Sequence, residues 1–163
     1  MTPESVTEIL SSPLAQELFA SNIPAHIAYT GLDGAPRSVP ISYTLNDGLF
    51  RVSSPLHARK VAALQADPRI ALSIDTTGAW PARALLVRGT AAVELSEGLP
   101  DQYLDATTRT LGADVTGFID SALAPLHPEW ATVTITPSWA KLIDFETVYT
   151  EALTELFAQV QVG

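Results

Sequence analysis

The chain has 163 residues, of which 47% are apolar, and a formal net charge of −9; this fits one domain with a core of its own. It contains no cysteine, which excludes disulfides and thiolate chemistry. No apolar run approaches the ~20 residues that span a bilayer, and residues 1–10 hold no base, unlike a secretory signal. We therefore expect a cytoplasmic protein without membrane partners. Its acidity also argues against nucleic-acid binding, which needs a broad basic face.

The chain begins with an apolar pattern of helical period. Leu10, Leu14 and Leu18 recur every four residues, which predicts one N-terminal helix over 1–21. Pro24 disfavours helical geometry in the residue before it, so we expect this helix to end close to residue 21.

Strand-like runs follow the helix. Residues 25–30 and 37–45 are predicted as strands, and a tight turn at 46–48 leads into an antiparallel strand over 49–53. Pro40 falls inside the second run. Because proline has no backbone N–H to donate, we expect Pro40 at a sheet edge or a bulge.

Ser54 and Pro55 have the pattern of a helix start, with Ser54 as the N-cap and Pro55 at the first helical position. This helix is expected to end at about Ala66, before Asp67-Pro68. The remaining elements are expected as strands over 69–75 and 84–95, the latter bent at Gly89, helices over 100–111 and 115–123, a hairpin of 131–136 and 139–145 around Pro137-Ser138, and an amphipathic helix over 148–160.

These elements predict a mainly β fold with peripheral helices. Six or seven strands have mostly local hairpin connections, and one crossover helix lies between the third and fourth strands. Such a pattern favours an antiparallel barrel or sandwich decorated by helices. No linker or repeat interrupts the chain, so we expect a single domain over 1–163.

Basic residues are concentrated in one part of this acidic chain. Residues 35–88 hold seven bases and three acids, and the difference gives that segment a charge of +4. A basic enclave of this size suggests a bound anion, and we interpret it as the site of a phosphorylated cofactor. The seven bases are Arg37, Arg51, Arg59, Lys60, Arg69, Arg83 and Arg88.

The expected helix start near Ser54 is the best candidate for the anion. Free amide groups and the helix dipole favour an anion at such an end. Arg59 and Lys60 follow in the opening turns, where they could add a guanidinium fork and an ammonium charge. The alternative is that Arg59 and Lys60 form an ordinary solvated helix face.

The other polar and aromatic candidates have simpler interpretations. Arg69 is expected to pair with a nearby carboxylate, and Arg83 and Arg88, five residues apart on one strand, are expected on opposite faces. Trp80 fits loop packing and ring stacking equally well. We expect Trp130 and Trp139 in the core or at an interface. No histidine pair has metal-ligand spacing, so no metal site is expected.

Five segments together resemble the flavin-binding split-barrel family related to pyridoxamine 5'-phosphate oxidase. They read RSVPISY, FRVSS, HARKVAALQADPRIALSI, LLVRGTAAVE and ITPSWAKLIDFET, and the resemblance covers residues 24–145. It implies a six-stranded antiparallel split β-barrel of Greek-key type. It also implies a homodimer in which each FMN lies in a groove between the subunits.

The resemblance also implies roles for individual residues. In such proteins the first of these strands faces the flavin ring, the end of the second strand contacts the phosphate side, and an Arg-Lys pair binds the phosphate. Transferred by position, the ring contacts are Arg37, Ser38, Val39, Pro40 and Ser42, the phosphate contacts are Ser53, Ser54, Arg59 and Lys60, and Trp80 and Trp139 border the groove.

One departure separates this chain from the true pyridoxamine phosphate oxidases. Those enzymes carry a C-terminal Arg-x-His-type substrate motif, whereas no Arg or His follows His127 here. We therefore expect an FMN-binding oxidoreductase with another small-molecule substrate, with NAD(P)H as a candidate, and no assigned catalytic side chain. The alternatives of the same fold are a deazaflavin-dependent reductase, whose anionic tail Arg51, Arg83 and Arg88 could serve, and a non-enzymatic haem- or flavin-binding protein.

Overall fold

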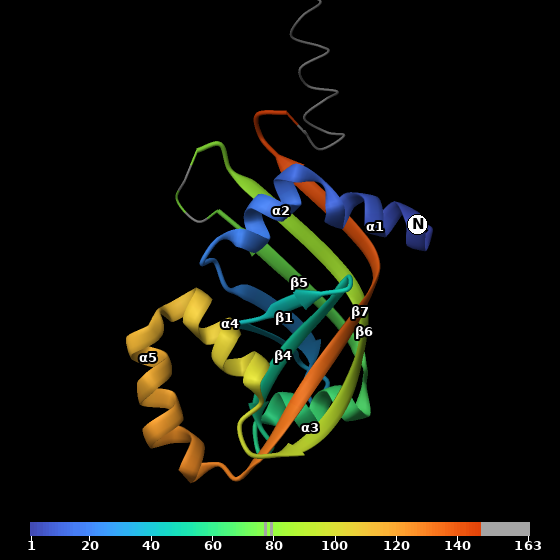
Figure 1. Cartoon of the computed structure of the whole chain (residues 1–163). Coiled ribbons are helices and arrows are strands. Elements are labelled where there is room, and N and C mark those ends of the chain that lie inside the picture. The colour runs from blue at the N-terminus through green and yellow to red at the C-terminus, as the bar shows by residue number, and fades with distance from the viewer. Residues whose placement is uncertain (77, 79, 148–163) are drawn as a thin grey trace, which may run out of the picture.

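A curved antiparallel sheet of seven strands forms the centre of the molecule (Figure 1). The computed structural model describes residues 1–76, 78 and 80–147. In space the strands follow the order β2-β1-β5-β6-β7-β4-β3. Their bounds are β1 (Ala25–Thr30), β2 (Pro36–Ile41), β3 (Thr44–Asn46), β4 (Leu49–Pro55), β5 (Arg69–Asp75), β6 (Arg83–Glu97) and β7 (Glu129–Asp144).

The two edge strands are consecutive in the chain. β2 pairs with β1 and β3 pairs with β4, although only Ser42 and Tyr43 separate β2 from β3. The sheet must therefore curl until its edges meet at these two residues, which produces a barrel that is split between β2 and β3. This confirms the predicted antiparallel split barrel. It has seven strands because the run expected over 37–45 changes partner strand at Ser42.

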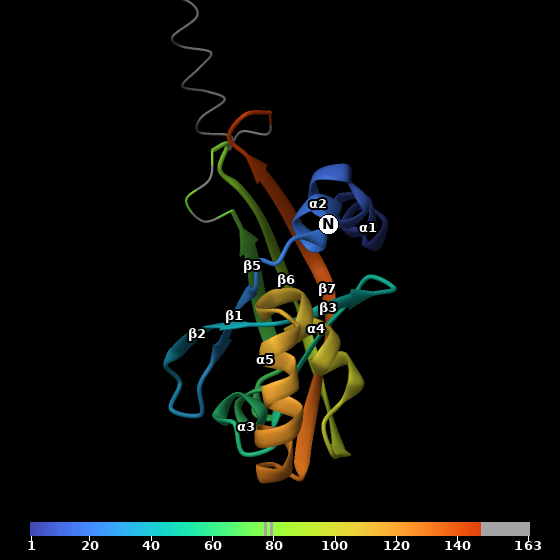
Figure 2. The same ribbon diagram turned by 60° about the vertical axis from the view of Figure 1, so that its left-hand side comes forward.

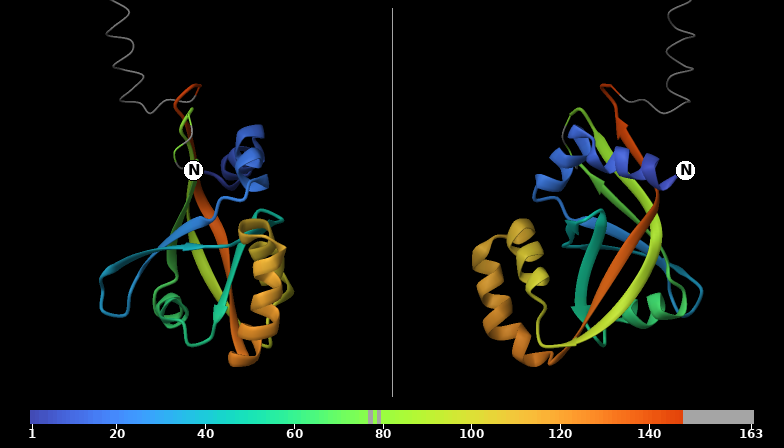
Figure 3. Two further views of the ribbon diagram at one scale, coloured as in Figure 1. Left: turned by 90° about the vertical axis from the view of Figure 1, so that its left-hand side faces the viewer. Right: turned by 45° about the vertical axis from the view of Figure 1, so that its right-hand side comes forward.

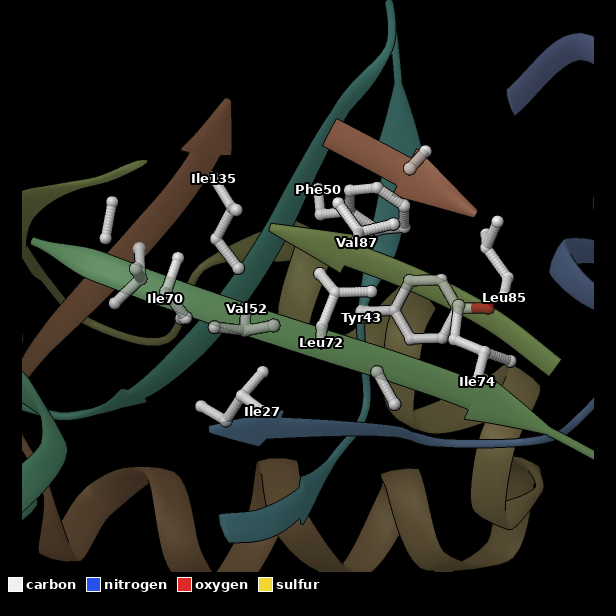
Figure 4. Packing of buried hydrophobic residues seen from close by; sticks show 14 of the residues in the cluster. Ile27, Tyr43, Phe50, Val52, Ile70, Leu72, Ile74, Leu85, Val87 and Ile135 are labelled. Carbon is white, nitrogen blue, oxygen red and sulfur yellow. The ribbon is translucent and has the colours of Figure 1, made fainter. Parts of the chain in front are cut away.

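Alternate residues of the strands fill the barrel, as a period of two requires. Phe50 and Val52 from β4 meet Leu72 from β5 and Val87 from β6 (Figure 4). The Tyr43 ring lies against that of Phe50, with centroids 5.8 Å apart. Burial raises the pKa of the Tyr43 phenol, so this hydroxyl stays neutral inside the core.

The expected hairpin at Pro137-Ser138 is wrong, because β7 runs unbroken beside β6. The proline instead marks a register shift, where Gly89 pairs with Pro137 and Arg88 with Trp139. Ser138 is the extra residue, and its Oγ donates to the Arg88 carbonyl oxygen at 3.3 Å. This β-bulge bends the long strand pair, which confirms the predicted bend at Gly89.

Two helices take the place of the single helix expected over 1–21. They are α1 (Pro3–Ser11) and α2 (Pro13–Ala20). Ser12 between them is extended, with φ −62° and ψ 148°, because a residue before proline is disfavoured in helical geometry. Both helices lie across one end of the barrel (Figures 1 and 3).

The helix expected to begin at Ser54-Pro55 begins four residues later. β4 continues through Pro55, which pairs with Trp130 of β7, and the Leu56 N–H donates to the Glu129 carbonyl at 3.0 Å. Ladder pairing with β7 thus prevails over the capping signal. The helix, α3 (Arg59–Ala66), has Ala58 as its N-cap and lies at the barrel end opposite α1 and α2 (Figure 2).

A helical hairpin packs beside β3 and β4. It comprises α4 (Asp101–Leu111) and α5 (Ala113–Phe118), which continues as a π-helical turn (Ile119–Leu123) and a 3-10 turn (Ala124–Leu126). Within residues 1–76, 78 and 80–147, no helix is long and apolar enough to cross a membrane. The helix expected over 148–160 lies outside the described residues.

Arg109 of α4 attaches this hairpin to the strand crossing. Its guanidinium donates to the carbonyl oxygens of Ser21 and Tyr43, at 2.6 Å each. It also lies 4.3 Å from the centroid of the Tyr43 ring. The arginine therefore connects α2, α4 and the chain between β2 and β3.

Candidate functional site

A partly buried lysine marks the start of α3. The Lys60 ammonium donates to the Ser54 hydroxyl at 3.0 Å, and Ser54 is only 3% exposed. No carboxylate of the described residues forms an ion pair with Lys60. Burial lowers the pKa of this ammonium. A cation that has lost water and met only a neutral oxygen favours an anion beside it.

The N-terminus of α3 adds backbone donors to this lysine. Ala58 makes no side-chain capping bond, and the first N–H groups of any α-helix have no partner within the helix. The helix dipole also favours negative charge at this end. Although the helix starts at Arg59 rather than after Ser54, the chain still brings Ser54, Lys60 and a helix N-terminus together, as the sequence predicts.

Arg37 and Arg59 line one pocket of about 290 Å3. Arg37 comes from β2 and Arg59 from the first turn of α3, so this pocket joins two of the predicted cofactor segments. Arg37 also forms an ion pair of 2.6 Å with Asp33. That pair is exposed and therefore weak, which leaves the guanidinium available to a competing anion.

β2 presents its predicted ring-contact residues on two faces. Ser38 and Pro40 point outward and are exposed, whereas Val39 packs against the core. β2 is an edge strand, which confirms the expectation for Pro40. The outer edge of such a strand carries unpaired N–H and C=O groups, and Ser42 follows directly after it.

Ser53 faces the other way from Ser54. Its hydroxyl is buried within 3.2 Å of the Thr132 hydroxyl, and the Gln102 amide of α4 donates to that threonine at 2.7 Å. Successive strand residues point to opposite faces, so Ser53 is directed toward α4. The phosphate contact assigned to Ser53 stays a prediction, and only the backbone of Ser53 could make it, because its hydroxyl is buried toward α4.

The tryptophans occupy three environments. Trp130 is buried, with its ring centroid 4.8 Å from that of Tyr103, which confirms its expected core position. Trp139 is half-buried on the outer face of the sheet. Trp80 is 80% exposed and belongs to the connection between β5 and β6, whose flanking strand ends lie at the barrel end opposite α3 (Figure 1). Within one protomer Trp80 is therefore not brought to the Lys60 site.

Two of the remaining arginines are held by carboxylates. Arg69 pairs with Asp67 at 2.6 Å, as expected, and these hydrogen bonds lower the pKa of Asp67 to about 2. Arg83 donates to Glu17 of α2 at 3.1 Å and lies 3.7 Å from Asp144. Arg83 is thus occupied as a link between α2 and the ends of β6 and β7, which makes it a poor site for an anionic tail.

Arg88 differs from these arginines. Its guanidinium carbon lies 4.3 Å from the centroid of the Trp139 ring, and no described carboxylate pairs with it. Arg88 lies on the outer face of the sheet, whereas the Arg83 side chain reaches α2. The two side chains therefore point to opposite faces, as their spacing of five residues predicts. The pairing with Trp139 could not be found in the sequence, because it depends on the β6–β7 bulge.

In the part of the chain that the structure describes, no group of three or more His, Asp or Glu side chains could hold a metal ion. What the Lys60 region does offer is a cation, a hydroxyl and backbone donors, which together suit a phosphate group.

Known proteins place this geometry in context. The model of the family described as pyridoxamine 5'-phosphate oxidase matches residues 12–144. No curated protein matches the chain. Among the solved structures that share the fold is an F420 reductase, with a TM-score of 0.61 and 19% identity over 77% of this chain and 94% of that one. A haem storage protein from Vibrio cholerae has a TM-score of 0.58 and 14% identity over 82% of this chain and 93% of that one. An FAD-binding protein from Mesorhizobium loti has a TM-score of 0.54 and 22% identity over 80% of this chain and 93% of that one.

At these identities the likeness to solved structures concerns the fold alone. The family match is more specific, because it extends from the start of α2 to the last residue of β7 and includes every strand of the sheet. This chain therefore belongs to the pyridoxamine 5'-phosphate oxidase family.

Proposed function

We propose that the chain binds FMN and acts as a flavin-dependent oxidoreductase on a small-molecule substrate. The observation that carries this proposal is the Lys60 ammonium, which is partly buried beside Ser54 and has no carboxylate partner among the described residues. A phosphate there would neutralise the charge and accept hydrogen bonds from both side chains and the first turn of α3.

The other predicted residues would orient the rest of the cofactor. Arg37 and Arg59, which line one pocket, would add positive charge near the phosphate. The outer edge of β2, at Ser38 and Pro40, would offer backbone groups to the flavin ring. When bound, the flavin supplies hydride or electron transfer, while the protein supplies binding and orientation. This division of labour suits a chain in which no nucleophilic side chain is assigned.

We also propose that the chain works as a homodimer with the cofactor in a groove between protomers, as the resemblance implies. The half-buried Trp139 on the outer sheet face supports this, and Trp80 would reach a cofactor only in such an assembly. We propose a substrate other than pyridoxamine phosphate, because residues 128–163 contain no Arg or His that could form the phosphate clamp of the true oxidases. NAD(P)H is the reductant to test first.

A deazaflavin coenzyme is the second candidate. It is favoured by the fold shared with an F420 reductase and by Arg88, which has no described carboxylate partner and could meet part of a longer anionic tail. Parallel titrations with FMN and with the deazaflavin separate the two. Haem, which is suggested by the neighbour from Vibrio cholerae, is tested by the visible absorption of the purified protein.

The proposal is tested by titrating cofactor-free protein with FMN and following flavin fluorescence. Lys60→Gln should weaken FMN binding more than tenfold, because a charge-assisted hydrogen bond contributes roughly 1.5–3 kcal/mol. The matched control is Lys141→Gln, which removes the only other lysine and should change the affinity less than about twofold. Equal losses in both variants, or none in Lys60→Gln, would remove Lys60 from the site.

A further inference from the structure

Arg88 and Trp139 form a flat platform on the outer face of the sheet. They face each other across the β6–β7 ladder, with the guanidinium carbon 4.3 Å from the ring centroid. Contact with the ring fixes the plane of the guanidinium while its N–H edge stays free to donate. Arg88 is exposed, and Trp139 is half-buried. Within one protomer the platform is therefore open to solvent and already ordered.

A pocket of about 260 Å3 opens beside this platform. Aliphatic groups such as Leu86 make up much of its wall, and the polar groups are few. A mostly apolar cavity with a few directed polar groups is typical of a small-molecule site. The lining residues that carry side-chain donors, acceptors or rings are His26, Ser38, Ser73, Arg88 and Trp139.

Charge identifies the kind of ligand that this pocket favours. Arg37 and Arg69, which line a neighbouring pocket together with Arg88, are each paired with an aspartate at 2.6 Å, whereas Arg88 has no such partner among the described residues. Its fork matches the two oxygens of a carboxylate. An anion is thus the missing complement of Arg88, and a flat ring is the natural complement of Trp139 and Leu86.

The pocket also shares lining residues with the neighbouring pocket that leads toward the candidate cofactor site. Arg88 lines a second pocket of about 460 Å3, which Arg37 also lines. Arg37 in turn lines the pocket that contains Arg59. In addition, Ser38 of β2, a predicted ring contact, lines the platform pocket itself. A molecule held against Arg88 would therefore lie next to the cofactor region.

We propose that this pocket binds the second reactant, and that this reactant is a planar organic acid whose carboxylate accepts a bidentate pair of hydrogen bonds from Arg88. Its ring lies against Trp139 and Leu86, with the hydroxyls of Ser38 and Ser73 at its edges. The reactant role rests on the proposed function. The binding of a planar carboxylate does not, because every group named here belongs to the chain itself.

The test uses benzoate and its uncharged isostere benzamide as probes, with the full chain both free of cofactor and saturated with FMN. Calorimetric titration gives affinities, and quenching of tryptophan fluorescence, compared with Trp139→Phe, locates the probe. We expect benzoate to bind at least tenfold more tightly than benzamide. Arg88→Gln should abolish that preference, and Arg88→Lys should restore part of it.

Lys141→Gln is the stringent control, because Lys141 pairs with Leu86 on the same strand ladder but does not line the pocket. It should leave the benzoate preference intact. Equal binding of benzoate and benzamide, or a preference that survives Arg88→Gln, overturns the inference. If the protein prefers benzoate but does not bind FMN, the carboxylate site is retained and the proposed function is refuted. Failure of the site and failure of the proposed function are therefore distinguishable.

Discussion

The Lys60 ammonium donates to the Ser54 hydroxyl at 3.0 Å across the junction between β4 and α3. Ser54 is held by pairing with Ala131 of β7, while Lys60 belongs to the first turn of the helix. The pair thus fixes a positive charge at a helix N-terminus, where the dipole favours negative charge. A cation placed there is unfavourable for the free protein and useful to one that binds a phosphate.

This placement predicts that removing the charge stabilises the cofactor-free protein. Burial lowers the pKa of Lys60 from 10.5, so the folded state holds the proton less tightly than the unfolded state. The resulting cost is fully present at neutral pH and vanishes as the pH rises through the folded pKa toward 10.5. Lys60→Met should therefore raise the free energy of unfolding at neutral pH, with a gain that shrinks in alkali. Urea unfolding at several pH values measures this, and a destabilised variant at neutral pH would contradict it.

The same pKa direction predicts how cofactor affinity depends on pH. Once Lys60 loses its proton it can no longer attract a phosphate. FMN affinity should therefore fall as the pH rises toward 10.5, starting below the pH at which an ordinary lysine titrates. Fluorescence titrations along an alkaline series check this. In Lys60→Gln the affinity should be low throughout and lack this fall; a parallel fall in both proteins would assign it to another group.

Gly89 is predicted not to tolerate a side chain. A Cβ built there would clash with the Thr136 carbonyl oxygen in the facing strand, so Gly89→Ala must push β6 and β7 apart at the bulge. We expect a loss of about 1–3 kcal/mol in the free energy of unfolding, as for other overpacked positions. Gly117→Ala is the control, because nothing lies within 4 Å of its added Cβ; a helical glycine replaced by alanine should gain about 0.5–1 kcal/mol. Equal stabilities for the two variants would refute the account of the bulge.

Arg109 is predicted to be a structural link between α4 and the strand crossing. Its carbonyl bonds to Ser21 and Tyr43 are lost in Arg109→Met, which should cost roughly 1.5–3 kcal/mol. Asp105→Asn, at an exposed residue one turn before Arg109 in the same helix, should change stability by less than about 0.5 kcal/mol. Chemical unfolding compares the variants. Hydrogen exchange at Tyr43 should rise in Arg109→Met alone, and unchanged protection there would contradict the role.

Period-two and helical patterns were sufficient to predict much of the fold. β1 and β5 have the bounds that alternation predicts, and the bend at Gly89 follows from a glycine within a long strand. Two of the errors lie where ladder pairing competes with a local signal. Ser54-Pro55 resembles a helix start, and Pro137-Ser138 resembles a turn, but both segments pair with long neighbouring strands, which local sequence does not reveal.

In the candidate site, too, local sequence predicts contacts between near neighbours but not contacts that depend on strand pairing. Lys60 and Ser54 were identifiable because they are near neighbours in the chain, so a local element brings them together wherever the helix begins. Arg88 and Trp139 are 51 residues apart by their numbering, and their contact depends on the register of β6 and β7. Trp80, which the resemblance assigns to the groove, is not brought to the Lys60 site within one protomer, and its contact with a cofactor stays a prediction.

The central claim is that a phosphate binds at Ser54, Lys60 and the start of α3. Comparing FMN with riboflavin, which lacks only the phosphate, tests it most directly when both are titrated into the native protein and into Lys60→Gln. The account predicts that the native protein prefers FMN by more than tenfold and that this preference collapses in Lys60→Gln while riboflavin affinity is unchanged. Equal affinity of the native protein for the two flavins, or an FMN preference that Lys60→Gln retains, would contradict it.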